Sequence, residues 1–515
     1  MTDDGGIRPE LAEVMRRQSL LHDRARPDAV AKRHALGRRS IRENLADLFD
    51  ASSFDEWGGL TVAAQRARRG LDDLIVSTPA DGVVTGVGTV AGQRVAVIGY
   101  DATVLAGTQG LMGHKKTDRM LEVIKRERLP VVLFAEGGGG RPGDTDVPTV
   151  GGLDVTTFTC FAALSGLVPR IGIASSRCFA GNATLFGLCD VTIATPEASI
   201  GMAGPAMIEG GGLGAVEADD VGPREVHIVN GVVDVAADSD ADAVAKAKQA
   251  LGFFAGPRTA WTAADQLALR DVVPPNRRRA YEVRKAIALL ADAESVLEIR
   301  PRFARGMVTA LARLEGRPIG VIANNPMHLA GAITSECADK AARFLQLCDA
   351  YDLPVLSLCD TPGMMVGPAA EKTGLVRHTT RLFTVAATLT VPIVTVILRK
   401  GYGLGAMAMA GGDFHASLAT LAWPTGEVGG MGLEGAVRLA MRKELAAIAD
   451  EDERARVYDE LVAAAYSHGH ALSAASYDEI DDVIDPALTR ARVAALLCGW
   501  QPPARDGRRR VVDTW

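Results

Sequence analysis

Two short turns of small residues occupy matching positions in the two halves of the chain, and each follows a β-rich run. Ala180-Gly181-Asn182 follows the run at 171–175, and Gly403-Leu404-Gly405 follows the run at 393–398. The first backbone N–H groups of a helix have no acceptor inside the helix, so a turn that opens a helix presents free donors. Two such donors aimed at one carbonyl oxygen form an oxyanion hole, in which one donor typically contributes about 3 kcal/mol. The turns therefore predict two related sites that act through the backbone.

The repeat extends well beyond these turns. Lys116, Arg119 and Leu129-Pro130-Val131 recur at one constant offset as Lys340, Arg343 and Leu353-Pro354-Val355. At an offset shorter by a single position, Val168-Pro169, Arg177 and Asp190 are matched by Val391-Pro392, Lys400 and Asp413. In a single turn, glycines could simply permit tight packing of a helix on a sheet, but repetition in register favours a function. The chain is predicted to contain two copies of one fold with one site in each.

Composition narrows the class of protein. The 515 residues are 48% hydrophobic and 23% charged, which is typical of two or three folded domains. A net charge of −7 argues against a nucleic-acid partner. The seven cysteines include no CxxC pair, so we expect reduced core thiols and no metal site. The N-terminus lacks a signal peptide and the apolar run at 382–398 is too short and interrupted to span a bilayer, so we expect a cytoplasmic enzyme without a membrane partner.

Short β-rich runs alternate with helical stretches from about residue 81, which is typical of an α/β fold. We expect a two-helix N-terminal arm over residues 1–60, one domain over 61–275, a second over 276–505 and a mobile tail over 506–515. The Pro- and Arg-rich stretch 272–277 is the expected linker between the domains. The arginines of the arm could form a solvated helix face or contact a phosphate group; they are Arg33, Arg38, Arg39 and Arg42.

Other motifs are less specific. The segment 401–406 fits the dinucleotide pattern G-x-G-x-x-G/A, but such a site should open its domain and the first half lacks the pattern. Walker A, HExxH and GxSxG sequences are absent. Equivalent strands end in Glu136-Gly137-Gly138-Gly139-Gly140-Arg141 and in Asp360-Thr361-Pro362-Gly363. These could be plain turns, but the glycines would let a ligand approach the backbone, so Gly138 and Gly139 are candidate substrate-binding residues.

Several longer motifs resemble the carboxyltransferase (β) subunit of biotin-dependent acyl-CoA carboxylases, the propionyl-CoA, acetyl-CoA and methylcrotonyl-CoA carboxylase group. In the first half they are Arg33-His34, Gly37-Arg38-Arg39, Arg42-Glu43, Ser53-Phe54 and the run 81–90. In the second half they are 323–326, 339–344, 360–363, Arg377-His378 and 422–425. The resemblance covers nearly the whole chain. It implies two tandem crotonase-like (ClpP/crotonase) α/β domains in a homo-hexameric core, with each active site between the first domain of one protomer and the second domain of another.

The resemblance also implies the reaction and its site residues. Carboxybiotin releases CO2, the ureido nitrogen of biotin takes the α-proton of the acyl-CoA, and the thioester enolate attacks CO2. Two oxyanions develop, which explains two backbone holes and no side-chain base. Carried over by position, Gly181 and Asn182 form the hole assigned to biotin, and Leu404 and Gly405 form the hole assigned to the acyl-CoA carbonyl.

The chain departs from the family pattern in both turns. Many relatives have Gly-Gly-Ala in the first turn and Gly-Gly-Ala-Tyr in the second, so Ala406 replaces a tyrosine. We therefore expect Ala406 and Met407 to contact the acyl group and to accept chains larger than acetyl, such as propionyl or another short or medium acyl group. The alternative, that Ala406 faces the protein core and the pocket is lined elsewhere, is equally open. A backbone donor survives any residue but proline, so Asn182→Ala should be mild.

Partners and alternatives follow from what the sequence lacks. It contains no Met-Lys-Met biotinylation site and no ATP-grasp pattern, so a separate biotin carboxylase and biotin carrier subunit are expected. Biotin is the expected cofactor, and an acyl-CoA is the expected substrate. Two alternatives remain at this point: the carboxyltransferase of a biotin-dependent decarboxylase, and an inactive scaffold subunit of a carboxylase complex.

Overall fold

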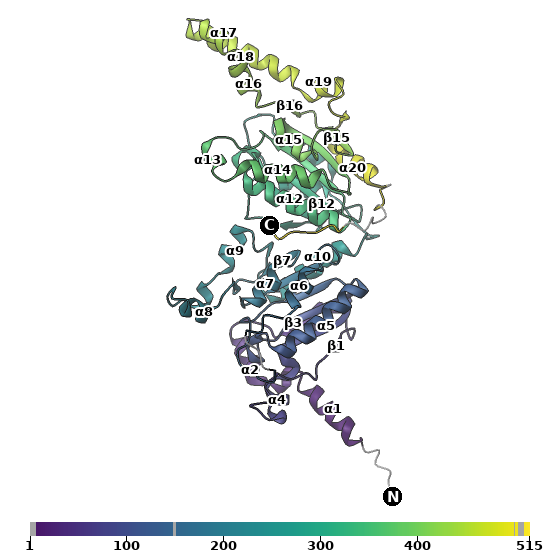
Figure 1. Ribbon diagram of the computed structural model, residues 1–515. Coiled ribbons are helices and arrows are strands. Elements are labelled where there is room, and N and C mark those ends of the chain that lie inside the picture. The colour runs from purple at the N-terminus through teal and green to yellow at the C-terminus, as the bar shows by residue number, and fades with distance from the viewer. Residues whose placement is uncertain (1–6, 148–150, 499, 503–508) are drawn as a thin grey trace. The chain divides into compact units, whose positions relative to one another are not determined.

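The computed structural model describes residues 7–147, 151–498, 500–502 and 509–515 (Figure 1). The chain forms two compact units, of which the first ends at Ala255 and the second begins at Gly256. The stretch 272–277, expected as a linker, lies inside unit 2. Its residues Val272 and Val273 are buried in the core of that unit, which explains why the boundary falls earlier than the sequence indicated.

Unit 1 contains a predominantly parallel sheet with an antiparallel edge. Its described helices are α1 (Pro9–Ser19), α2 (Pro27–Ala35), α3 (Ile41–Leu48), α4 (Leu71–Ser77), α5 (Leu111–Glu127), α6 (Thr157–Ala162), α7 (Gly181–Gly187), α8 (Pro205–Gly210), α9 (Arg224–Asn230) and α10 (Asp240–Phe254). Its described strands are β1 (Asp55–Trp57), β2 (Val83–Val90), β3 (Gln93–Tyr100), β4 (Val131–Phe134), β5 (Arg170–Ala174), β6 (Arg177–Phe179), β7 (Val191–Ala194), β8 (Ser199–Gly201) and β9 (Val235–Ala236). The order in the sheet is β1-β2-β3-β4-β5-β7-β9, and β6 pairs with β8.

Unit 2 repeats this arrangement. Its described helices are α11 (Val283–Leu290), α12 (Ser335–Ala350), α13 (Pro368–Glu371), α14 (Leu375–Ala386), α15 (Gly403–Met409), α16 (Leu433–Ala440), α17 (Arg442–Ala447), α18 (Glu451–His468), α19 (Ala471–Ser476) and α20 (Thr489–Cys498). Its described strands are β10 (Leu297–Ile299), β11 (Met307–Leu314), β12 (Arg317–Asn324), β13 (Val355–Thr361), β14 (Ile393–Tyr402), β15 (Ala419–Ala422), β16 (Glu427–Gly429) and β17 (Asp482–Val483). The order is β10-β11-β12-β13-β14-β15-β17, with β16 on β14.

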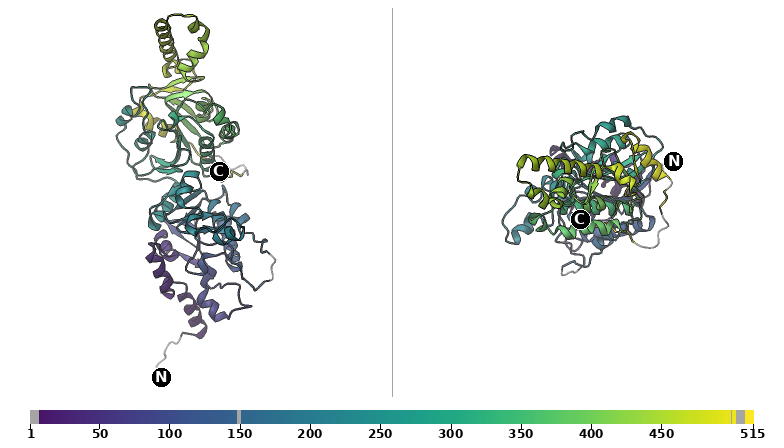
Figure 2. Two further views of the ribbon diagram at one scale, coloured as in Figure 1. Left: turned by 90° about the vertical axis from the view of Figure 1, so that its left-hand side faces the viewer. Right: turned by 90° about the horizontal axis from the view of Figure 1, so that it is seen from above.

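The two sheets confirm the predicted α/β duplication. In each, three strands pair antiparallel before the rest run parallel, and Val83 pairs with Tyr100 as Met307 pairs with Asn324. In unit 2, α12 and α14 lie side by side, and α12 packs on β11 and β12 (Figure 1). The opposite face is covered by α11 and α20, which share a core with alternate residues of β11, β12, β13 and β14. The helices α16 to α18 project from one end of this unit (Figures 1 and 2).

The N-terminal segment differs from the expected two-helix arm. Its described residues form three α-helices, and β1 joins the edge of the unit 1 sheet. The third helix, α3, is part of the folded unit because it packs on α10 and buries Ile41, Leu45 and Leu48. Ser40 and Glu43 form a capping box at its start.

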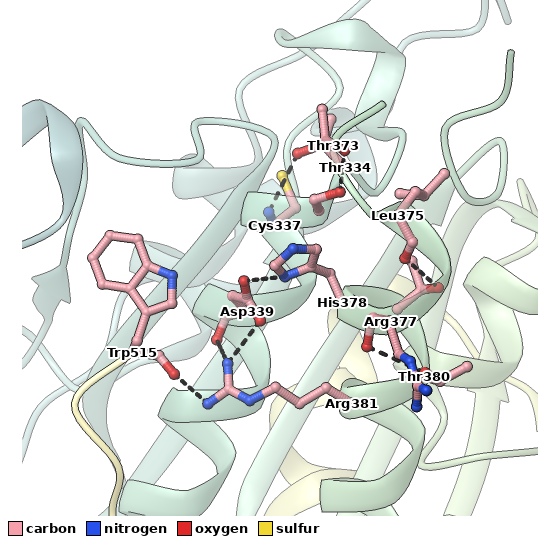
Figure 3. Close-up of polar contacts among 12 residues, drawn as sticks. Thr334, Cys337, Asp339, Thr373, Leu375, Arg377, His378, Thr380, Arg381 and Trp515 are labelled. Atoms are coloured by element: carbon pink, nitrogen blue, oxygen red, sulfur yellow. Dashed lines mark hydrogen bonds and ion pairs between the residues drawn. The ribbon is translucent and has the colours of Figure 1, made fainter. Parts of the chain in front are cut away.

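The segment expected to be a mobile tail lies only partly among the described residues. From position 509 onward it is bound to unit 2: Arg510 forms an ion pair with Asp352 at 2.7 Å, and Asp513 accepts from Arg381 at 2.7 Å. Arg381 also contacts Asp339 and the carbonyl oxygen of Trp515 (Figure 3). Charge pairs between residues so far apart along the chain cannot be read from a local sequence pattern.

Candidate functional site

The first small-residue turn opens α7, as the sequence predicted. Ala180 precedes the helix with φ 51° and ψ −119°, a conformation that strains any residue with a Cβ. At the equivalent place in unit 2, Gly403 has φ 56°. Among the described residues, none accepts a hydrogen bond from the backbone N–H of Gly181 or Asn182. The turn therefore presents two free donors, held in place by a strained backbone.

The side chain of Asn182 has a structural task that the sequence did not reveal. It is fully buried, its Oδ1 accepts from the backbone N–H of Gly139 at 2.9 Å, and its Nδ2 donates to the carbonyl of Gly107 at 3.4 Å. The asparagine thus ties the turn to the glycine loop that follows β4. Replacement by alanine would leave a buried N–H without its acceptor, so the expectation of a mild Asn182→Ala variant does not follow from this structure.

The glycine loop lies against the first turn. Gly139 has φ 86°, and a Cβ built there would lie 2.6 Å from Cβ of Ala180, so only glycine fits. Gly138, in contrast, is exposed, and only Thr108 lies within 4 Å of a Cβ built at that position. Of the two predicted substrate-binding glycines, one is therefore packed against the turn and one is accessible.

Gln109 is a neighbour of the first turn that the sequence reasoning missed. A Cβ built on Gly181 would lie 1.9 Å from Oε1 of Gln109, and the amide of Gln109 donates to the hydroxyl of Tyr100 at 3.0 Å. The internal repeat could have identified Gln109 from the sequence. The isolated bridge of Gln109 with Gly140 stands at the positions of the repeat that match the bridge of Ile333 with Met364 in unit 2.

The second turn opens α15 at the end of β14. Leu404 and Gly405 lie in the first turn of α15, where backbone N–H groups have no acceptor inside the helix, so this turn also presents two donors. A Cβ built on Gly405 would lie 2.7 Å from Cα of Gly363, in the loop that follows β13. Because β13 and β14 run parallel, their carboxyl ends meet at one edge of the sheet, where α/β folds commonly bind ligands.

The side chains around the second turn point differently from the expectation. Ala406 is 1% exposed and belongs to the core, whereas Leu404 is 61% exposed. Met407 is half-buried. Within this unit, Leu404 rather than Ala406 presents apolar surface beside the free donors.

A buried polar pair supports the second turn from β16. The Tyr402 hydroxyl donates to Glu427 Oε2 at 2.9 Å, and Arg277 Nε lies 2.9 Å from the other carboxylate oxygen. Burial raises the pKa of both the Tyr402 hydroxyl and the Glu427 carboxyl. The tyrosine is therefore a hydrogen-bond donor and structural support rather than a base.

The His378 motif forms a separate polar cluster. His378 Nδ1 lies 2.5 Å from Asp339 Oδ2, and Arg381 Nη1 lies 2.8 Å from Asp339 Oδ1 (Figure 3). Across the part of the chain that the structure describes, no group of three or more His, Cys, Asp or Glu side chains could hold a metal ion. In the same residues, no helix combines the length and apolar character needed to cross a bilayer.

Comparison with known proteins agrees with this architecture. Residues 32–502 match the carboxyl transferase domain model. The methylmalonyl-CoA carboxyltransferase 12S subunit of Propionibacterium freudenreichii subsp. shermanii is 35% identical, over 91% of this chain and 90% of the relative.

Two solved structures superpose closely on the chain. A single-chain, multi-domain long-chain acyl-CoA carboxylase matches with a TM-score of 0.90 and 56% identity over 95% of this chain. The chain spans about half of that protein, 49% of its length. The transcarboxylase 12S crystal structure with methylmalonyl-CoA and methylmalonic acid bound matches with a TM-score of 0.84 and 32% identity, over 99% of both chains. With this match over nearly its whole length, the chain belongs to the carboxyl transferase family.

Proposed function

We propose that this chain is the carboxyltransferase component of a biotin-dependent acyl-CoA carboxylase. The observation that supports this most directly is the pair of turns in equivalent positions, each with two free backbone donors, in a member of the carboxyl transferase family. The replacements in the turns, Ala180 and Asn182, leave the donors free. These free donors argue against the alternative of an inactive scaffold subunit.

The chemistry assigns a task to each turn. A thioester loses its α-proton readily only when the negative charge on its oxygen is stabilised, and we assign this stabilisation to the N–H groups of Leu404 and Gly405. We assign the N–H groups of Gly181 and Asn182 to the ureido oxygen of biotin. A carbonyl-type oxygen can accept both hydrogen bonds from the backbone alone. Biotin, when bound, supplies the carboxyl group and accepts the α-proton. The residues of this chain hold the two oxygens, orient the reactants and exclude water.

Substrate and assembly are proposed from the relatives. The 12S relative is named for methylmalonyl-CoA and the single-chain relative for long-chain acyl-CoA, which supports an acyl group larger than acetyl. The 12S structure is described as a hexamer assembly, which supports a homo-hexameric core here. We propose that a biotin carboxylase and a biotin carrier supply the carboxyl group, either as separate subunits or within a longer chain.

The decisive assay combines the purified chain with biotin carboxylase, a biotinylated carrier, ATP and radioactive bicarbonate. Acetyl-, propionyl-, octanoyl- and palmitoyl-CoA are then compared for incorporation of acid-stable radioactivity. The proposal expects incorporation that needs this chain and is faster with propionyl-CoA or a longer substrate than with acetyl-CoA. Absence of transfer to every acyl-CoA, with an active carboxylase and carrier, would refute it.

Proline variants test the backbone donors. Gly405→Pro is a poor probe because its ring would collide with Gly363, whereas the exposed side chain of Leu404 leaves room for a proline ring. Leu404→Pro should lower kcat about 100-fold or more through loss of one donor. Glu451→Pro, at the exposed first position of α18, is the matched control and should leave kcat unchanged. Equal activity of the two variants in intact hexamers would refute the assignment.

The reverse reaction, in a decarboxylase, would use the same turns. Affinity purification followed by mass spectrometry of biotinylated partners separates the two directions. A membrane-embedded partner subunit would support the decarboxylase, and a biotin carboxylase would support the proposed function.

A further inference from the structure

Two carboxylates occupy equivalent places at the ends of strands that lead to the turns. Glu136 follows β4, and Asp360 lies in β13 at the matching position of the repeat. In each unit, the next residue pairs with the segment that leads into the turn: Gly137 with Cys178, and Thr361 with Gly401. Each carboxylate therefore lies where a strand becomes the loop that packs on the turn.

Asp360 joins β13 to β14 at a fault in the sheet. The regular pairing of these strands is interrupted by a bulge between Cys359 and Thr361. The fully buried Asp360 side chain bridges this fault, because its Oδ1 accepts from the backbone N–H of Lys400 at 3.2 Å and from Lys400 Nζ at 2.8 Å. Its Oδ2 lies 3.1 Å from Nη2 of Arg399.

Both segments joined by Asp360 shape the second hole. β14 continues through Tyr402 into the turn, and the loop after Asp360 touches Gly405 closely at Gly363. A shift at the join would therefore displace the donors relative to the loop. A misplacement of about 1 Å can lower a rate about 100-fold.

The carboxylate of Asp360 is shared by two side chains of β14. Two cations, Arg399 and Lys400, face the single carboxylate of Asp360. Asp360 therefore holds both the backbone and two consecutive side chains of β14.

Unit 1 builds a related join with residues of the N-terminal segment. Glu136 accepts from Arg33 Nη1 at 2.8 Å and from Nη2 at 2.7 Å. Arg38 donates to the hydroxyl of Ser176 at 2.7 Å, and Ser176 occupies the position of the repeat that matches Arg399. These two arginines thus bind protein groups next to the first turn, rather than forming a solvated face.

We propose that Asp360 is a positioning residue for the second oxyanion hole, and that Glu136 is its counterpart for the first. Asp360 fixes the distance between the hole turn and the loop that packs on it. This inference rests on the proposed function.

The test compares Asp360→Asn with Asp292→Asn in the reconstituted complex. Asp292 is a matched control because it is also buried and is bonded to Arg490 at 2.5 Å and to the backbone N–H of Gly316 at 2.7 Å. It contacts the hairpin that leads into β12, at the opposite end of the parallel strands from the turn. Asp360→Asn should lower kcat about 10- to 100-fold with KM for acyl-CoA within about 3-fold, whereas Asp292→Asn should lower Tm and keep kcat within about 2-fold.

Rescue and an activity-independent readout complete the test. Asp360→Glu, which keeps the charge, should recover part of kcat. Hydrogen exchange of the amides at 403–409 should accelerate in Asp360→Asn but not in Asp292→Asn, and in unit 1 Glu136→Gln should accelerate exchange at 181–187. If Asp360→Asn does not fold, Lys400→Met, which keeps the pair of Asp360 with Arg399, takes its place with the same expectations.

The outcomes are distinguishable. Equal kcat or equal exchange in Asp360→Asn and Asp292→Asn overturns the positioning role while leaving the proposed function intact. A wild-type complex that transfers to no acyl-CoA refutes the proposed function, and the exchange measurement then decides the positioning role by itself.

Discussion

Asn182 offers a direct test of how the first turn is built. In Asn182→Ala the buried backbone N–H of Gly139 loses its acceptor, which costs about 1–3 kcal/mol. The longer bond from Nδ2 to the carbonyl of Gly107, at 3.4 Å, adds about 0.5 kcal/mol. We therefore expect the free energy of unfolding of unit 1 to fall by about 1.5–3.5 kcal/mol, equivalent to a Tm lower by about 3–14 °C.

The assay is urea unfolding of the purified chain, followed by intrinsic fluorescence and by limited proteolysis within unit 1. Asn230→Ala is the matched control. Asn230 also accepts a backbone N–H, from Val232 at 3.1 Å, but it is exposed, so water can replace its bond. The control should lose less than about 1 kcal/mol. If Asn182→Ala loses no more than Asn230→Ala, the buried bonds do not hold the turn.

Three further changes have expected outcomes. Ala180→Gly should raise the free energy of unfolding by about 1 kcal/mol, because relief of strain at φ 51° outweighs the added freedom of glycine in the unfolded chain. Burial lowers the pKa of Lys340 to about 7 from 10.5, so the unfolded chain binds more protons between these values. Stability should rise with pH across that window by at most about 1.4 kcal/mol per pH unit, and Lys340→Met should flatten the rise. Leu404→Ala should lower kcat/KM for palmitoyl-CoA relative to propionyl-CoA about 5- to 100-fold, whereas Ala406→Gly should not change that ratio.

For each of these three predictions, one result would contradict the reasoning. A lower midpoint of unfolding in Ala180→Gly would show that the alanine is not strained. For Lys340, the dependence of the free energy of unfolding on pH is compared between Lys340→Met and Lys443→Met, a change at an exposed lysine. Equal slopes in the two variants would contradict the titration of Lys340. For substrate choice, a shift in chain-length preference caused by Ala406→Gly alone would support the sequence prediction that Ala406 contacts the acyl group.

The duplication could be predicted from the sequence because it depends on order along the chain. A nearly constant offset between matching residues placed equivalent strands and turns in two copies, and both sheets follow. The two turns were found for the same reason, since backbone N–H groups at a helix start are free whatever the side chains do. Residue motifs spread over the chain indicated the family, and the match over residues 32–502 confirms it.

The directions of individual side chains were decided only by the tertiary structure. Asn182 turns inward because the loop at Gly139 offers a buried donor. Ala406 is enclosed because α15 packs on β13 and β14. Asp360 draws its cations from a different strand, across a bulge that no local pattern announces. Turns and periodicity are local properties of the chain, so the sequence determines them. Burial and ion pairing depend on groups distant in sequence, and only folding brings those groups together.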